Sequence, residues 1–244
     1  MRKLLIEIKY DGTNYHGWQV QNNALTVQEV FQNAVEKVFS QRLDVKGCSR
    51  TDSGVHANSY FLTIDTDMDI SDYGVVMALN TQLPKDMAAV SCREVPADFH
   101  PRYSCKSKQY VYKIYNGKIR NPFYADYSYH YRYDLDVEYL NKEVQAFVGT
   151  YDYSGFCSAK SDVEDTVRTV YSCRVYREGD MVFFEVEADG FLYNMVRIMA
   201  GPLICISRGR IKSGQLKDII KSKDRSLAGR TAPPQGLYLN KVNY

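Results

Sequence analysis

The expected order of strands and helices occurs twice along the chain, and this repeat limits the fold more than any other feature. The first half is expected to contain a strand at residues 4–8, a helix at 27–39, strands near 44–49 and 59–64, a helix opened by Ser71 and a strand at 87–92. The second half is expected to contain a strand at 108–115, a helix around 137–148, strands near 167–176 and 181–188, a helix at 193–207 and a strand at 237–242. Each half therefore reads β-α-β-β-α-β, the ferredoxin-like order.

Local sequence signals support these assignments. Leu4, Ile6 and Ile8 alternate with polar residues, as expected for a strand with one buried face. Thr26 and Glu29 have the spacing of a capping box at the start of the first helix. The residues that follow form an apolar stripe with helical spacing, which predicts a helix packed on one face.

We predict an α+β fold in which two ferredoxin-like halves, residues 1–105 and 106–244, join into one extended, mainly antiparallel sheet. Helices are expected on one face of this sheet, and the other face, with a central active-site cleft, is expected to be free for a ligand. No Gly/Ser linker or low-complexity tract separates the halves. We therefore expect one compact body rather than two tethered domains.

The chain has no apolar run of the roughly 20 residues that cross a bilayer, and its first residues alternate apolar and polar side chains instead of forming the apolar block of a signal peptide. We expect a cytoplasmic protein without membrane association. The six cysteines are scattered, without a C-x-x-C pair or a nearby histidine, so neither a disulfide framework nor a zinc site is indicated. We expect them to be buried thiols.

The net charge is only +2, but the charge is unevenly distributed. Residues 191–244 contain ten Lys or Arg and two Asp, which gives +8 and leaves −6 for residues 1–190. A basic C-terminal quarter suits a phosphate backbone, because each neutralised phosphate releases condensed counterions. The same charges could lie on a solvated helix face, and charge alone does not decide between these interpretations.

The densest group of turn-forming and functional residue types is Ser49-Arg50-Thr51-Asp52-Ser53-Gly54-Val55-His56-Ala57, between two expected strands. A carboxylate at Asp52 would be exposed to substrate and fixed in position by the flanking strands. The alternative is an Asp-Ser-Gly turn in which Asp52 only accepts hydrogen bonds from nearby backbone amides. Residue type and spacing alone leave both interpretations open.

Further sequence blocks favour the catalytic interpretation. The loop closely resembles the catalytic loop of the tRNA pseudouridine synthase A family. The segment Tyr10-Asp11-Gly12, Gly17-Trp18-Gln19-Val20-Gln21 and Thr26-Val27-Gln28 is similar to that family's opening signature. Later blocks that match the family, in the family's order, are Phe99–Ser104, Lys108–Tyr112, Gly190–Arg197 and Ala232–Leu239. The resemblance thus runs from one end of the chain to the other.

The resemblance implies an enzyme that isomerises uridine to pseudouridine in tRNA, with the anticodon stem and loop as the family's usual target. The reaction breaks the N1–C1′ glycosidic bond, turns the uracil within the site and joins its C5 to C1′, so no redox cofactor, metal or ATP is needed. Asp52 matches the family's catalytic aspartate, a nucleophile or a base at the sugar. Arg197 matches the arginine that pairs with this carboxylate; taken alone, it would more often be a structural ion pair.

Other residues receive substrate-binding roles from the resemblance. Tyr110 matches the active-site tyrosine that stacks on the target base and can help to remove the C5 proton, and such stacking contributes about 1–3 kcal/mol. Arg50 is expected to help take the base out of its stack, and Leu192 to form the apolar floor beneath it. Arg102 lies in a matching block, and His56 is expected to shape the loop or to touch RNA.

Tyr110 is distinguished from the other tyrosines only by its place in a block, because the chain contains 21 of them. We assign one conspicuous run to one face of a strand in the core or at an interface. Its members are Tyr127, Tyr129, Tyr131 and Tyr133.

Two departures from the family pattern bear on the RNA target more than on the chemistry. Ser49 stands where the family usually has glycine, and Pro101 stands in a block that more often reads F-H-A-R. Both leave Arg50, Asp52 and Arg102 in place.

The resemblance also implies a homodimer in which one tRNA contacts both subunits.

Two other functions stay open. A tRNA-binding or chaperone module without catalysis would keep the basic segment, but the retained Asp52, Tyr110 and Arg197 argue against it. A carboxylate-dependent glycoside hydrolase would carry paired acids at a defined separation, whereas the loop offers Asp52 without an acidic neighbour. Incubation with unmodified tRNA distinguishes the three functions. A synthase forms pseudouridine, a binding module forms no product, and a hydrolase releases free uracil.

Overall fold

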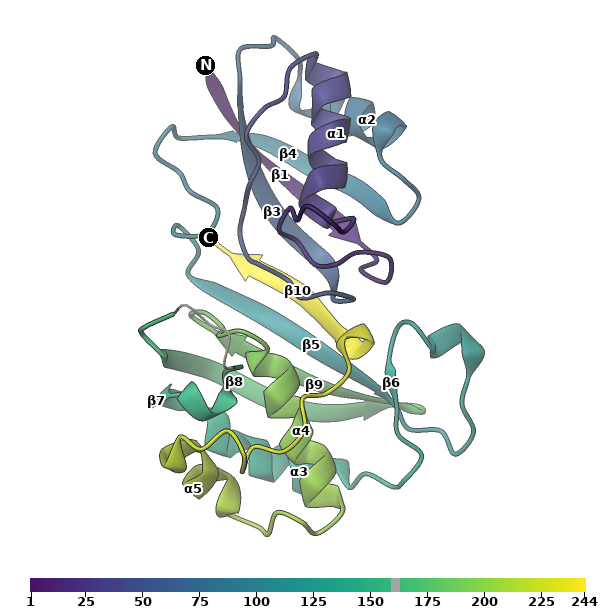
Figure 1. The fold of residues 1–244 in the computed structure, drawn as a ribbon, viewed down its shortest axis with the longest axis vertical. Coiled ribbons are helices and arrows are strands. Elements are labelled where there is room, and N and C mark those ends of the chain that lie inside the picture. The colour runs from purple at the N-terminus through teal and green to yellow at the C-terminus, as the bar shows by residue number, and fades with distance from the viewer. Residues whose placement is uncertain (159–162) are drawn as a thin grey trace. The chain divides into compact units, whose positions relative to one another are not determined.

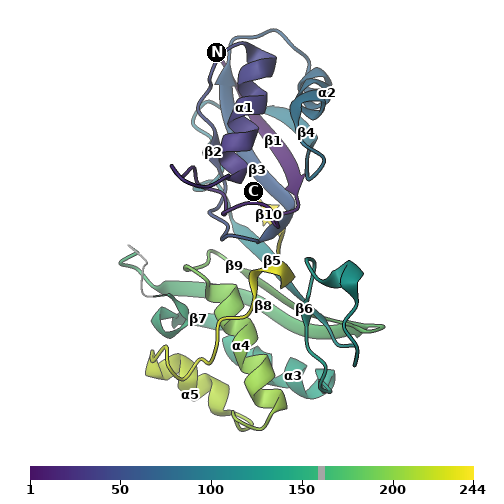
Figure 2. The same cartoon turned by 45° about the vertical axis from the view of Figure 1, so that its right-hand side comes forward.

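The computed structural model describes residues 1–158 and 163–244. Two compact units make up the chain: unit 1 is Met1–Lys106 with Tyr238–Tyr244, and unit 2 is Ser107–Leu237. These units differ from the expected halves, 1–105 and 106–244, in the placement of the last strand. Most helices and strands of both units are labelled in Figure 1, and β2 is labelled in Figure 2.

Unit 1 has a mainly antiparallel sheet with two helices. Its strands are β1 (Arg2–Tyr10), β2 (Lys46–Gly47), β3 (His56–Thr66), β4 (Met87–Val95) and, from Tyr238 on, β10 (Leu237–Asn243); its helices are α1 (Val27–Phe39) and α2 (Asp72–Gln82). The strands follow the order β4-β1-β3-β10, and β2 pairs with β3. Strand β1 is antiparallel to β3 and β4, and α1 contacts α2. The order of elements expected from the sequence is confirmed.

The predicted helix starts of unit 1 are also confirmed. The Thr26 side chain accepts a hydrogen bond from the backbone N–H of Glu29 at 3.4 Å. The Ser71 hydroxyl accepts one from the N–H of Gly74 at 3.1 Å. Each cap satisfies a backbone donor that has no partner inside its own helix.

The last strand packs with unit 1 because it adds to the edge of β3. Tyr238 pairs with His56 in a parallel register, and the backbone N–H of Lys106 donates to the carbonyl of Asn243 at 2.8 Å. The Tyr244 hydroxyl donates to the carbonyl of Pro101 at 2.8 Å. Alternation of apolar residues predicts a strand here but does not specify which strand it joins, so the sequence could not place it in unit 1.

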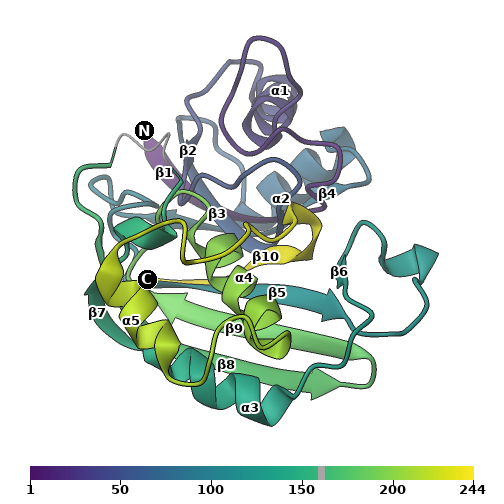
Figure 3. The same cartoon turned by 60° about the horizontal axis from the view of Figure 1, so that its bottom comes forward.

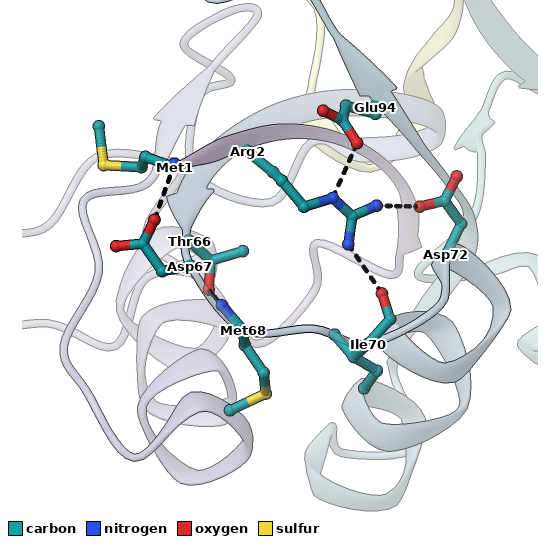
Figure 4. Close-up of polar contacts among 8 residues, drawn as sticks. All are labelled: Met1, Arg2, Thr66, Asp67, Met68, Ile70, Asp72 and Glu94. Atoms are coloured by element: carbon teal, nitrogen blue, oxygen red, sulfur yellow. Dashed lines mark hydrogen bonds and ion pairs between the residues drawn. The ribbon is translucent and has the colours of Figure 1, made fainter.

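A guanidinium near the N-terminus ties three parts of unit 1 together (Figure 4). Arg2, at the start of β1, donates to the carboxylate of Glu94 on β4 at 2.7 Å and to that of Asp72 on α2 at 3.2 Å. It also donates to the carbonyl of Ile70 at 2.9 Å. These bonds fix the start of α2 relative to the strands beneath it.

Unit 2 consists of mainly antiparallel strands and α-helices (Figures 2 and 3). Its strands are β5 (Ser107–Tyr115), β6 (Tyr129–His130), β7 (Gly149–Asp152), β8 (Val167–Glu178) and β9 (Met181–Ala188); its helices are α3 (Val137–Glu143), α4 (Met195–Ser207) and α5 (Gln215–Ser222). The strands follow the order β5-β9-β8-β7, and β6 pairs with β5 in parallel. The α+β class with mainly antiparallel strands is confirmed.

Unit 2 also contains features that the sequence did not indicate. The helix expected at 137–148 ends at Glu143 and continues as a 3-10 turn, and β6, β7 and α5 were not predicted. The assignment of the tyrosine run to one strand face is wrong: β6 spans two residues only, Tyr131 is buried, and Tyr127 and Tyr133 are 44% and 47% exposed.

Two further observations concern the whole described chain. None of the helices in residues 1–158 and 163–244 has the length and apolar character needed to cross a membrane. All six cysteines are free thiols; Cys48 and Cys173 are buried, as expected, whereas the other four are half-buried.

Asp152, at the end of β7, connects that strand to the segment after α5. Its Oδ2 lies 2.8 Å from Nζ of Lys223, and its Oδ1 accepts from the Thr166 hydroxyl at 2.6 Å and from the N–H of Ser154 at 3.0 Å. The Lys223 ammonium and the Thr166 hydroxyl hold the pKa of Asp152 well below its usual range. The ionised carboxylate therefore stabilises the folded state.

We predict that Asp152→Asn, which keeps the hydrogen-bond acceptor and removes the charge, lowers the free energy of unfolding at neutral pH. The loss should be about 1 kcal/mol or less, because the Lys223 side chain is 58% exposed. A depressed folded-state pKa gives stability that is fully present above the unfolded pKa of about 4 and is lost progressively as the pH falls from there through the folded pKa. Urea unfolding at pH 7 and pH 3 should thus show a difference that shrinks at pH 3; an equal difference at both values would contradict the assignment.

Candidate active site

The loop that carries Asp52 connects the short strand β2 to β3. Arg50 is exposed, Thr51 is buried and Asp52 is half-buried. Gly54 has a φ of +75°, and the N–H of Val55 donates to the carbonyl of Asp52 at 3.2 Å, which closes a tight turn. Asp52 thus lies in a turn at the start of a long, buried strand. Its backbone is fixed there, and its side chain is partly accessible.

The N-terminal segment that follows β1 lies against this loop. The N–H of Trp18 donates to the carbonyl of Thr51, and the N–H of Gly54 donates to the carbonyl of Tyr15, both at 3.1 Å. The hydroxyls of Tyr10 and Thr51 are hydrogen-bonded at 2.8 Å. The opening signature and the Asp52 loop, about 40 residues apart in sequence, therefore form one structure.

Two glycines permit this close approach. A Cβ atom on Gly12 would lie 2.0 Å from the carbonyl oxygen of Val55. Gly17 has a φ of +85°, and a Cβ there would lie 2.6 Å from the carbonyl oxygen of Thr51. Any other residue at these positions would displace the loop, and at Gly17 it would also strain the backbone.

Aromatic side chains support the loop from β3. Trp18 stacks on Tyr60 with a ring-centroid distance of 4.2 Å, and the Tyr60 hydroxyl donates to the carbonyl of Ser49. Ser49, where the family usually has glycine, is thus held through a backbone oxygen that any residue supplies. Pro101, the other departure, also contributes its carbonyl, as the acceptor for Tyr244.

His56 begins β3 and is 1% exposed, stacked on Tyr238 at 4.6 Å. Its Nδ1 lies 3.0 Å from the backbone nitrogen of Gly12 and 3.1 Å from Oδ1 of Asp11. One ring nitrogen cannot serve both partners at once: an Nδ1 without a hydrogen accepts from Gly12, and an Nδ1 that carries one donates to Asp11. This placement favours a role in shaping the loop over contact with RNA.

Arg102 lies on the surface of unit 1, in the turn after β4. Its backbone N–H donates to Nδ1 of His100 at 3.1 Å, and its guanidinium carbon lies 5.8 Å from the centroid of the Tyr103 ring. Burial lowers the pKa of His100, and the positive charges of Lys46, Arg102 and Lys3 lower it further. Arg102 therefore belongs to a locally positive surface.

In unit 2, Tyr110 packs against Phe191, the neighbour of Leu192 in sequence. Tyr110, on β5, is 5% exposed and meets Phe191 edge to face at a centroid distance of 5.0 Å. Leu192, next to Phe191, is 4% exposed. Two blocks that lie about 80 residues apart in sequence thus meet in the structure.

Arg197 lies in the first turn of α4, and its guanidinium is held at two points. Nε donates to the carbonyl of Ala232 at 2.8 Å, and Nη1 donates to Oδ1 of Asn194 at 2.6 Å. Asn194 precedes the helix with a φ of +61°. Since the Tyr112 hydroxyl donates to the carbonyl of Pro233 at 2.8 Å, the blocks at 108–112, 190–197 and 232–236 all meet in unit 2.

The structure thus gathers the expected residues into two sets. Arg50, Asp52 and His56 share one loop of unit 1, with Arg102 elsewhere in that unit; Tyr110, Leu192 and Arg197 belong to unit 2. The sequence did not identify the supporting roles of Tyr60, Asn194 and Ala232. Gly12 and Gly17 in the opening signature were the sequence signal from which a close backbone contact could have been predicted.

Comparison with known proteins agrees with this arrangement of blocks. A profile of the family described as tRNA pseudouridine synthase matches residues 6–104 and 144–244. The chain is 46% identical over 244 residues to tRNA pseudouridine synthase A of Thermoanaerobacter sp. (strain X514), with 100% of both chains covered. It is 43% and 41% identical to the proteins of that name from Caldicellulosiruptor saccharolyticus and Clostridium acetobutylicum, again over 100% of both chains. The chain belongs to the tRNA pseudouridine synthase family.

For this member of the tRNA pseudouridine synthase family, we predict that Gly17→Ala loosens the Asp52 loop. The left-handed backbone alone should cost about 1–2 kcal/mol, and the clash with the Thr51 carbonyl adds to it. Trp18 is the only tryptophan, so its fluorescence should shift to longer wavelength as its packing is lost.

Gly179→Ala is the matched control, because Gly179 also has a positive φ, of +56°, but a Cβ there meets nothing within 4 Å. Urea unfolding should show a smaller loss for this variant, with Trp18 emission unchanged. Equal losses in the two variants, with identical emission, would show that the contact of Gly17 with Thr51 is unimportant.

Proposed function

We propose that this chain converts uridine to pseudouridine in tRNA, with Asp52 as the catalytic residue. Membership of the synthase family supports the reaction, and the fixed loop around the half-buried Asp52 carries the assignment of the residue. The N1–C1′ bond breaks, the uracil turns, and C5 bonds to C1′. C5 then loses its proton and N1 gains one, so the product is an isomer of the substrate.

The proposed role of Asp52 is to attack the sugar as a nucleophile or to remove a proton from it, and either role needs an ionised carboxylate. We propose Arg197 as its partner in the working enzyme. The bonds of Arg197 to Ala232 and Asn194 support this role, because they orient the guanidinium plane and leave less freedom to be lost on pairing.

Tyr110 and Leu192 are the proposed binding surface for the uracil. Stacking of a base on an aromatic ring contributes about 1–3 kcal/mol, and Leu192 supplies apolar contact. Since both side chains are nearly buried, a base that reaches them has left its own stack. Tyr110 is also proposed to help in removal of the C5 proton.

We propose that Arg50 and Arg102 contact the RNA and that His56 shapes the loop. Arg50 and Arg102 are exposed cations in unit 1, suited to phosphates or to the space left by the extruded base. His56 contributes by holding the start of β3. Lysines and arginines of the basic C-terminal quarter add further phosphate contacts.

The finer features of the proposal concern target and assembly. We propose that the target uridines lie in the anticodon stem and loop, that the active site is a central cleft, and that the enzyme is a cytoplasmic homodimer that needs no cofactor. The exposed tyrosines and the basic C-terminal quarter fit a surface shared by RNA and a second subunit. Mapping of the uridines that are converted in tRNA tests the target. The molecular mass measured by sedimentation tests whether the enzyme is a dimer.

We predict that Asp52→Ala lowers pseudouridine formation in unmodified tRNA by at least about a thousandfold, because the only group proposed to act at the sugar is removed. The fold and the affinity for tRNA should stay close to those of the wild type. Pseudouridine mapping after incubation, with binding measured in parallel, gives both quantities. Asp44→Ala, which removes a 74% exposed carboxylate from the same unit, is the control and should remain active.

Three results would contradict the proposal. Pseudouridine formation by Asp52→Ala at the wild-type rate would show that Asp52 is not the catalytic residue. A wild-type protein that binds tRNA but forms no product would be a binding module. Release of free uracil would indicate a hydrolase.

A further inference from the structure

Two arginines lie against one exposed tyrosine on the surface of unit 2. The guanidinium carbons of Arg132 and Arg208 lie 5.0 Å and 4.9 Å from the centroid of the Tyr133 ring, and Nη2 of Arg132 donates to the Tyr133 hydroxyl at 3.0 Å. All three residues are exposed. We call Arg132, Tyr133 and Arg208 the Tyr133 cluster.

The Tyr133 cluster has an excess of positive charge. Within residues 1–158 and 163–244, neither guanidinium forms an ion pair with a carboxylate, and the adjacent Asp134 is exposed. The hydrogen bond from Arg132, together with the positive charges of Arg132 and Arg208, also lowers the pKa of the Tyr133 phenol. Cation–π contacts hold the arginines on the ring but leave their charges uncompensated, so an anion placed between them would relieve the repulsion.

Arg208 is fixed in place before any ligand binds. Its Nε donates to the hydroxyl of Tyr131 at 3.2 Å, and that hydroxyl is hydrogen-bonded to the Ser207 hydroxyl at 3.1 Å. Tyr131 is 3% exposed, so the support is part of the core. A positioned guanidinium loses little conformational freedom on binding, which favours a specific site over a mobile surface charge.

The Tyr133 cluster is separate from the residues proposed to act on the uridine. Arg197 lies in the first turn of α4 and Arg208 follows its last turn. Arg208 lies eleven positions after Arg197, which corresponds to about 16 Å along the helix. A group bound at Arg208 is therefore separate from one bound at Arg197.

We infer that the Tyr133 cluster binds a backbone phosphate of the RNA substrate at a distance from the target uridine. Guanidinium groups match phosphate oxygens in bidentate hydrogen bonds. Further exposed cations follow in the sequence after Arg208 and after Asn116, whose side chain donates to the carbonyl of Tyr133. These cations are Lys118, Arg120, Arg210 and Lys212. The inference rests on the proposed tRNA substrate and adds a contact that positions the RNA without reading its sequence.

The test compares tRNA binding by the wild type and by the R132Q/R208Q variant over a series of salt concentrations. The variant should bind several-fold more weakly, and its plot of log Kd against log salt should be shallower by about 0.7–0.9 for one lost phosphate contact. Arg42→Gln is the control, because Arg42 is exposed but already paired with Glu36 at 2.8 Å, and it should change neither quantity.

Equal affinity and equal salt dependence in R132Q/R208Q and the wild type would overturn the inference. If, in addition, R132Q/R208Q lost the dimer mass in sedimentation, the Tyr133 cluster would be a protein contact. If instead the wild type bound inorganic phosphate and R132Q/R208Q did not, the cluster would be a site for a free anion. Should R132Q/R208Q fail to fold, Arg132→Gln alone provides the same comparison. Normal tRNA binding without pseudouridine formation would contradict the proposed function and leave this binding test intact.

Discussion

The position of Asp52 depends on two places where the chain has no side chain. At Gly12 and Gly17 the backbone after β1 comes so close to the loop that a Cβ would lie 2.0 Å and 2.6 Å from the carbonyl oxygens of Val55 and Thr51. Backbone hydrogen bonds then lock the two segments together. The buried strands β1 and β3 carry this contact, so the sheet of unit 1 serves as the support for one partly accessible carboxylate.

The same principle orients the charged groups of unit 2. Arg197 is held by the carbonyl of Ala232 and the side chain of Asn194, and Arg208 is held by the buried Tyr131. Fixed groups need little reorganisation when charge develops or a phosphate arrives.

Local patterns predicted most of the fold. The strand alternation of Leu4 to Ile8 and the caps at Thr26 and Ser71 were found because each depends on neighbours in sequence. The unit to which β10 adds, and the burial of Tyr131 between exposed tyrosines, depend on contacts between distant residues. The candidate site was likewise predicted only in part. The sequence blocks identified Asp52, whereas the hydrogen bond from Tyr60 that supports its loop was found only in the structure.

Amide hydrogen exchange of the loop tests most directly whether the chain itself fixes Asp52. The N–H of Gly54 bonds to Tyr15 and that of Val55 bonds to Asp52, so both should exchange slowly in the free protein. Addition of unmodified tRNA should change these rates little. Rapid exchange in the free protein, with protection only when tRNA is bound, would show that RNA orders the loop and would contradict this account.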